Sequence, residues 1–86
     1  MTKNINLEKI GDIMQQMGQS LQLIAITHLP QVAAKGHAHY LVSKTNDITS
    51  IKCLDGEGRV LELARMLSGA TVTPAAIANA QALLNA

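Results

Sequence analysis

The chain has 86 residues, 48% of them hydrophobic, and a formal net charge of +1, which suits one small domain over residues 1–86. The absence of a basic block excludes the electrostatic footprint of a nucleic-acid-binding surface, and a single cysteine, Cys53, excludes an internal disulfide. No signal peptide is evident and no apolar run approaches the ~20 residues that span a bilayer, so a soluble, cytoplasmic protein with no membrane contact is expected.

The first third of the chain predicts a helix, a strand and a short helix. Apolar residues at three- and four-residue steps predict an amphipathic helix over residues 6–18. A continuously apolar run predicts a strand over 21–27, buried on both faces as in a parallel sheet. Pro30, which is tolerated in the first turn of a helix, predicts a short helix over 29–35.

The middle of the chain predicts a β-hairpin followed by a loop. Residues that favour strands lie at 38–44 and again at 48–54. Between them, Thr45-Asn46-Asp47 has the chemistry of a turn, so the two strands are expected to pair. The glycine-containing stretch 55–58 is interpreted as a loop.

Two further helices are predicted in the last third. An amphipathic helix over 59–68 ends at Gly69, a residue type favoured just past a helix end. Thr73 as N-cap and Pro74 at the first helical position begin a last helix that runs to about Asn85. Together the elements predict an α/β fold with about three strands and four helices, containing one buried parallel-type strand and a hairpin.

His28 is the candidate functional residue, because it follows the predicted buried strand and precedes a predicted helix. The carboxyl end of such a strand is where α/β proteins bind ligands, so its imidazole could donate a hydrogen bond to an anion. It could also be a capping or core histidine whose partners are backbone groups. The residues alone favour this structural role.

The remaining motifs carry little chemistry. His37 and His39 would share one face of a strand and could chelate a metal, but no third ligand lies nearby, so no metal site is predicted. Gly56 and Gly58 lack the third glycine and the lysine that a phosphate-binding loop needs. Neither a G-x-x-x-x-G-K-[ST] motif nor an apolar strand that ends in Asp-Glu is present.

Several collinear stretches nevertheless resemble the carboxyl-terminal signature of the RecN family, bacterial DNA-repair ATPases related to the SMC proteins. The similarity covers roughly residues 10–85, which makes it more specific than any single motif. The stretches are Ile26-Thr27-His28-Leu29-Pro30-Gln31-Val32-Ala33-Ala34, His39-Tyr40-Leu41-Val42-Ser43-Lys44, Arg59-Val60-Leu61-Glu62-Leu63-Ala64-Arg65-Met66-Leu67-Ser68-Gly69, and Ala75-Ala76-Ile77-Ala78-Asn79-Ala80 before Leu83-Leu84.

The resemblance implies that this chain is the last part of an ABC-type nucleotide-binding head, which in RecN-like proteins is split by a long coiled coil. His28 matches the family's switch histidine, which reaches the γ-phosphate of ATP in the closed head dimer. The resemblance therefore implies a catalytic and nucleotide-binding role for His28, with ATP and Mg as cofactors of the complete protein. It also implies a part in DNA double-strand-break repair and recombination, with DNA bound through the full-length, nucleoid-associated protein.

The chain itself is expected to be a truncated product or a fragment, because the phosphate loop, the signature motif and the Asp-Glu strand lie upstream in RecN. Its partner would be the remainder of the head, and alone it should not hydrolyse ATP. An exposed strand edge beside residues 21–27 would permit a homodimer. The alternative is a free-standing protein-interaction module with no nucleotide chemistry, whose strand edge and apolar helix faces bind a partner.

Overall fold

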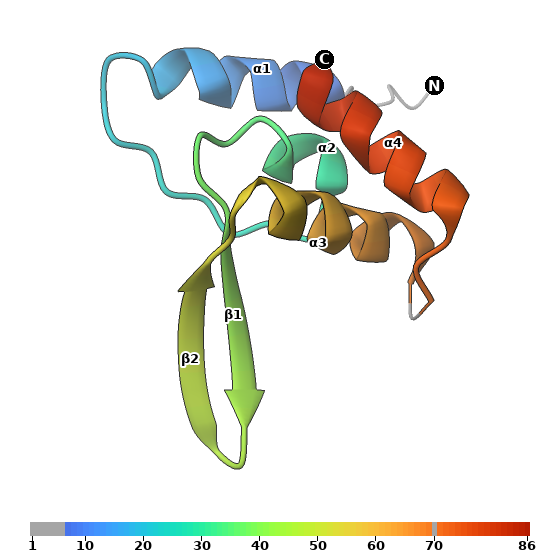
Figure 1. Ribbon diagram of the computed structural model, residues 1–86. Helices are drawn as coiled ribbons and strands as arrows, with labels where there is room; N and C mark the ends of the chain where they lie inside the picture. The colour runs from blue at the N-terminus through green and yellow to red at the C-terminus, as the bar shows by residue number, and fades with distance from the viewer. Residues whose placement is uncertain (1–6, 70) are drawn as a thin grey trace, which may run out of the picture.

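The computed structural model describes residues 7–69 and 71–86, and in this part of the chain it combines helices with one β-hairpin (Figure 1). The helices gather in one body, from which the hairpin projects as an arm. The elements are α1 (Leu7–Met17), α2 (Pro30–Ala33), β1 (Tyr40–Thr45), β2 (Ile48–Cys53), α3 (Gly56–Ser68) and α4 (Pro74–Asn85). These helices match the four predicted ones, and none is long and apolar enough to cross a membrane.

The short helix α2 is central to the helical body. It contacts α1 on one side and both α3 and α4 on the other. Gly11 of α1 allows the first of these contacts, since a Cβ atom there would lie 2.8 Å from Lys35 Cγ and 3.1 Å from the Gln31 carbonyl oxygen. Lys35 then extends along α1 to an ion pair with Asp12, with 3.0 Å between Nζ and Oδ1.

The core is small and lies where α3 and α4 pack against the end of α2. Leu63 and Ala64 are fully buried there, as the amphipathic pattern predicts. Small side chains allow the helix backbones to approach closely, and most of the cluster is alanine. Its buried members are Ala34, Leu63, Ala64, Ala76 and Ala80, and the half-buried side chains around them include Val60, Leu67, Ile77 and Leu84.

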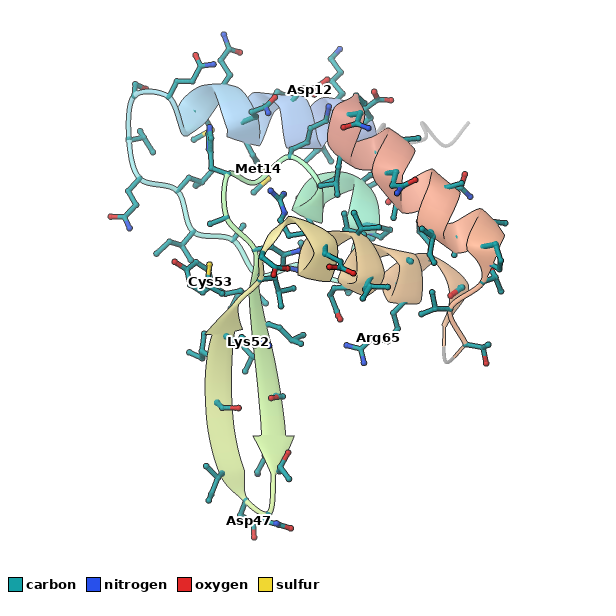
Figure 2. All side chains as sticks on the ribbon, viewed as in Figure 1. Asp12, Met14, Asp47, Lys52, Cys53 and Arg65 are labelled. Carbon is teal, nitrogen blue, oxygen red and sulfur yellow. The ribbon has the colours of Figure 1, made fainter. Side chains whose placement is uncertain are left out.

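The predicted hairpin is confirmed, with antiparallel pairing from Tyr40↔Cys53 to Thr45↔Ile48. The two residues of the turn, Asn46 and Asp47, have φ of 51° and 65°. A two-residue turn with positive φ at both positions matches the twist of the strands, and Asn and Asp adopt this conformation more readily than most residues. Figure 2 shows Asp47 at the tip of the arm.

The prediction of a buried strand over residues 21–27 is wrong. This segment is extended but forms no β-ladder with any described residue, so the sheet has two strands rather than three and no parallel pair. The side chains of Ile24 and Ile26 are 81% and 101% exposed. A strand needs a neighbour to satisfy its backbone donors and acceptors, and no backbone hydrogen bond joins residues 22–27 to another described segment.

The prediction of a loop over residues 55–58 is also wrong, because α3 begins at Gly56. Asp55 is the N-cap, and its Oδ1 accepts a hydrogen bond of 2.7 Å from the backbone N–H of Gly58. This cap stabilises the first turn and offsets the low helix propensity of its two glycines. The other helix signals are confirmed: Gly69 ends α3 with a φ of 81°, and Thr73 caps α4 ahead of Pro74.

Candidate functional site

The turn that carries His28 is fixed by the backbone on its carboxyl side. The N–H of Leu29 donates a 3.0 Å hydrogen bond to the Thr27 hydroxyl oxygen. Leu29 itself is extended, as the residue before a proline prefers to be, and its carbonyl oxygen accepts from the N–H groups of Val32 and Ala33. His28 therefore lies at the end of an extended segment, directly before the first turn of α2.

His28 is exposed, and this excludes the core interpretation of the residue. The capping interpretation fails as well, because Leu29 is the N-cap of α2 and no side chain caps that helix. Among the described residues, none accepts or donates a hydrogen bond to the His28 imidazole. The ring is thus free to meet a ligand, while the backbone beneath it is held in place.

His28 opens onto a hollow of about 1130 Å³ between α1, the extended segment and the hairpin. His37 and His39 line the same hollow, so the fold brings all three histidines of the sequence to one place. Most of the rest of its wall is apolar, and Figure 2 shows Met14 on the inner side of α1. The apolar lining comes mainly from Met14, Leu21, Leu23, Ile24, Ala25, Ile26, Val32, Leu41, Val42, Ile51 and Met66.

His39 differs from the other two histidines because it is half-buried. Burial lowers its pKa below the ordinary value of 6.5, the nearby Arg59 guanidinium lowers it further, and Glu62 opposes both effects. The neutral imidazole is therefore the favoured form. Two buried polar atoms in this cluster, His39 Nδ1 and Arg59 Nε, have no hydrogen-bond partner among the described residues.

Arg59 joins α3 to the connection between α2 and β1. Its Nη2 donates a 2.8 Å hydrogen bond to the carbonyl oxygen of Gly36 and a longer one, 3.5 Å, to that of Ala34. Arg59 is not predicted as a functional residue, because the amphipathic pattern places the start of the helix at Arg59 itself. The signal was Asp55, whose position as N-cap puts Arg59 one full turn inside α3.

The described residues contain no group of three His, Cys, Asp or Glu side chains that could hold a metal ion. His37 and His39 both precede β1, so the alternation of a strand does not place them on a common face. Cys53 is the last residue of β2 and is exposed there.

Fold and site together define a mixed α/β segment in which an unpaired stretch with exposed apolar side chains lies beside a largely apolar hollow. No family model matches the chain. The chain is, however, similar to DNA repair proteins named RecN. It is 41% identical over 79 residues to RecN of Vibrio cholerae. It is 46% identical over 79 residues to RecN of Xylella fastidiosa (strain Temecula1) and 44% identical over 80 residues to RecN of Streptomyces coelicolor. These alignments cover 87–88% of the chain but 14% of each relative, so the chain spans about one seventh of the length of the curated relatives it matches. On the basis of this similarity, the chain belongs to the RecN family and corresponds to the carboxyl-terminal part of RecN.

Proposed function

We propose that this chain is the carboxyl-terminal segment of the ATPase head of a RecN-like protein that acts in DNA double-strand-break repair in the cytoplasm, and that His28 is its switch histidine. The observation that carries the proposal is the similarity to RecN proteins over 87–91% of the chain, together with the exposure of His28. The relatives are named DNA repair proteins, and the resemblance stated above supplies the ATPase chemistry.

The position of His28 supports a role as a hydrogen-bond donor to a phosphate group. The imidazole is exposed and has no described protein partner, whereas the Thr27–Leu29 hydrogen bond of 3.0 Å and helix α2 fix the backbone next to it. A donor that is held at the γ-phosphate before the reaction stabilises the charge that spreads over the transferring group.

The extended stretch that precedes His28 supports the idea of a missing sheet neighbour. Its side chains are apolar, yet Leu23, Ile24 and Ile26 are 38%, 81% and 101% exposed. Apolar exposure on this scale, combined with unpaired backbone groups, is typical of a strand whose neighbours belong to another part of a protein. In a complete RecN the rest of the head would cover it.

The residues of this segment fit one part of a nucleotide site. His28 can donate to a terminal phosphate oxygen, whereas the resemblance assigns the phosphate loop and the magnesium-binding carboxylates to other parts of RecN. Bound Mg–ATP would supply the phosphoryl group that is hydrolysed. This segment would contribute the donor and fix the backbone that carries it.

The test is a His28→Ala substitution in a complete RecN protein that carries this segment. ATP turnover should fall roughly 100- to 1000-fold while the fold is kept, because one hydrogen-bond donor to the transition state is lost. His37→Ala is the matched control, since it removes an exposed histidine that lines the same hollow. Unchanged turnover in the His28 variant would contradict the proposal.

A second candidate function, a protein-interaction module without nucleotide chemistry, is favoured by the same apolar hollow. It predicts that substitutions in residues 23–26 abolish binding to a partner, whereas His28→Ala does not change that binding.

Under the leading proposal the 86-residue chain does not hydrolyse ATP alone. Magnesium-dependent hydrolysis by the pure chain that His28→Ala abolishes would contradict that part.

A further inference from the structure

Arg59 is the one described side chain of α3 that forms hydrogen bonds to the carbonyl groups of the α2 C-cap and of the connection that follows it. Its Nη2 lies 2.8 Å from the Gly36 oxygen and 3.5 Å from the Ala34 oxygen. Ala34 is the C-cap of α2, and Gly36 lies two residues further on in the connection to β1, where its N–H donates a 3.2 Å hydrogen bond back to the Ala33 carbonyl oxygen. The contact therefore holds the end of α2 to α3.

The sequence holds Arg59 firmly in this position. The Asp55 cap fixes the first turn of α3, and the N–H of Arg59 donates a 2.9 Å bond to the Asp55 carbonyl oxygen. Arg59 is half-buried, and its Nε is fully buried. A guanidinium held in this way cannot move without moving its acceptors.

Helix α2 connects these acceptors to the turn that carries His28. It is one compact turn, with Pro30 and Val32 buried and with Leu29 bonded to the backbone of Val32 and Ala33. His28 precedes Pro30 by two residues, and its imidazole has no hydrogen-bond partner among the described residues. A shift or rotation of α2 would therefore move His28 by a similar amount.

We propose that Arg59 is a positioning residue for His28, because it ties the carboxyl end of α2 to α3 while His28 lies just before the amino end of the same helix. This inference rests on the proposed function. Displacements of about 1 Å at a reacting centre can cost as much as roughly a hundredfold in rate. Only one helical turn separates the Arg59 hydrogen bonds from His28, so their loss could shift His28 enough to slow ATP hydrolysis.

The experiment measures ATP hydrolysis by a complete RecN protein that carries this segment. Arg59→Ala should lower kcat by about tenfold and leave KM for ATP nearly unchanged, because the tie affects the geometry of the transition state rather than nucleotide binding. Arg65→Ala is the matched control: Arg65 is an exposed arginine of the same helix that pairs with Glu62, and its loss should leave kcat unchanged.

Arg59→Lys covers the case in which the alanine variant does not fold. A lysine keeps the cation but not the planar fork of donors, so a folded lysine variant should show a kcat between those of the wild type and Arg59→Ala, about threefold below wild type. A folded lysine variant with the wild-type kcat would overturn the inference.

A double-mutant cycle separates positioning from a general loss of stability. If Arg59 acts through His28, Arg59→Ala should cause no further loss of kcat in a His28→Ala background, and additive losses would overturn the inference. If His28→Ala slows turnover and Arg59→Ala does not, this inference alone fails. If His28→Ala has no effect, the proposed function fails and this inference fails with it.

Discussion

Exposure distinguishes His39 from the other two histidines of this chain. His28 and His37 are exposed, whereas His39 is half-buried beside Arg59. The sequence predicted correctly that His28 lies between an apolar stretch and a helix. It could not predict that the ring is exposed and without a protein partner, because that depends on which segments pack around it. His28 therefore gained support as a candidate only from the structure and from the similarity to RecN.

The lowered pKa of His39 makes the stability of the chain depend on pH. Since the folded chain binds a proton at His39 less readily than the unfolded chain does, the contribution of His39 to the free energy of unfolding is fully kept above the ordinary pKa of 6.5. It falls as the pH drops through 6.5 toward the lower folded-state value. Urea unfolding of the 86-residue chain at about pH 7.5 and about pH 5 measures this loss.

The loss in the free energy of unfolding between about pH 7.5 and about pH 5 should be smaller in the His39→Gln variant, because a glutamine side chain cannot take up a proton. His37→Gln, at an exposed histidine two residues away, should keep the loss of the wild type. An equal loss in the wild type and in His39→Gln would contradict the assignment to His39.

At the scale of elements, local signals predicted the hairpin and the helices well. The Asn46-Asp47 turn, the Thr73-Pro74 start and Gly69 each act through their immediate neighbours, so the sequence contains the information directly. The start of α3 was missed because its glycines were given more weight than the Asp55 cap. The strand over 21–27 was predicted wrongly for a different reason: β-structure needs a partner that local sequence does not specify.

The contact between α1 and α2 depends on Gly11. Gly11→Ala should destabilise the chain by about 1 kcal/mol, because overpacking against the Gln31 carbonyl and Lys35 outweighs the gain of ~1 kcal/mol in helix propensity. Gly56→Ala is the control: a Cβ at this position of α3 meets nothing within 4 Å. It should stabilise the chain by about 0.5 kcal/mol.

Thermal or urea unfolding of the two glycine variants measures both changes in the free energy of unfolding. A Gly11→Ala variant as stable as Gly56→Ala would show that α1 does not pack closely on α2.

At the scale of the whole molecule, burial is uneven. The α2–α3–α4 side has a compact core around Leu63, while the other side has a hollow of about 1130 Å³ with exposed apolar walls. Ile24 and Ile26 are among the most exposed large hydrophobic side chains of the described chain. A surface of this kind favours association with another protein surface, either the rest of a RecN head or a second copy of the chain.

We therefore expect the isolated 86-residue chain to self-associate through this surface. An Ile24→Ser/Ile26→Ser double variant should weaken the association by about tenfold or more, because burying one such side chain contributes about 1.5–3 kcal/mol. Ile48→Ser is the matched control, since Ile48 is 70% exposed at the far end of the hairpin and does not line the hollow.

Sedimentation velocity over a range of concentrations measures the association of the three proteins. A larger loss of association in Ile48→Ser than in the double variant would place the contact on the hairpin instead.

The sequence by itself determined the helices, the hairpin turn and the similarity to RecN, because caps, turn residues and apolar periodicity act over a few neighbouring residues. Only the tertiary structure decided that residues 21–27 lack a strand neighbour, that His28 is exposed, and that Arg59 binds the end of α2. These features depend on contacts between segments far apart in the chain, such as the 23 residues that separate Arg59 from Gly36. No local pattern specifies such contacts, since each segment would look the same with another partner beside it.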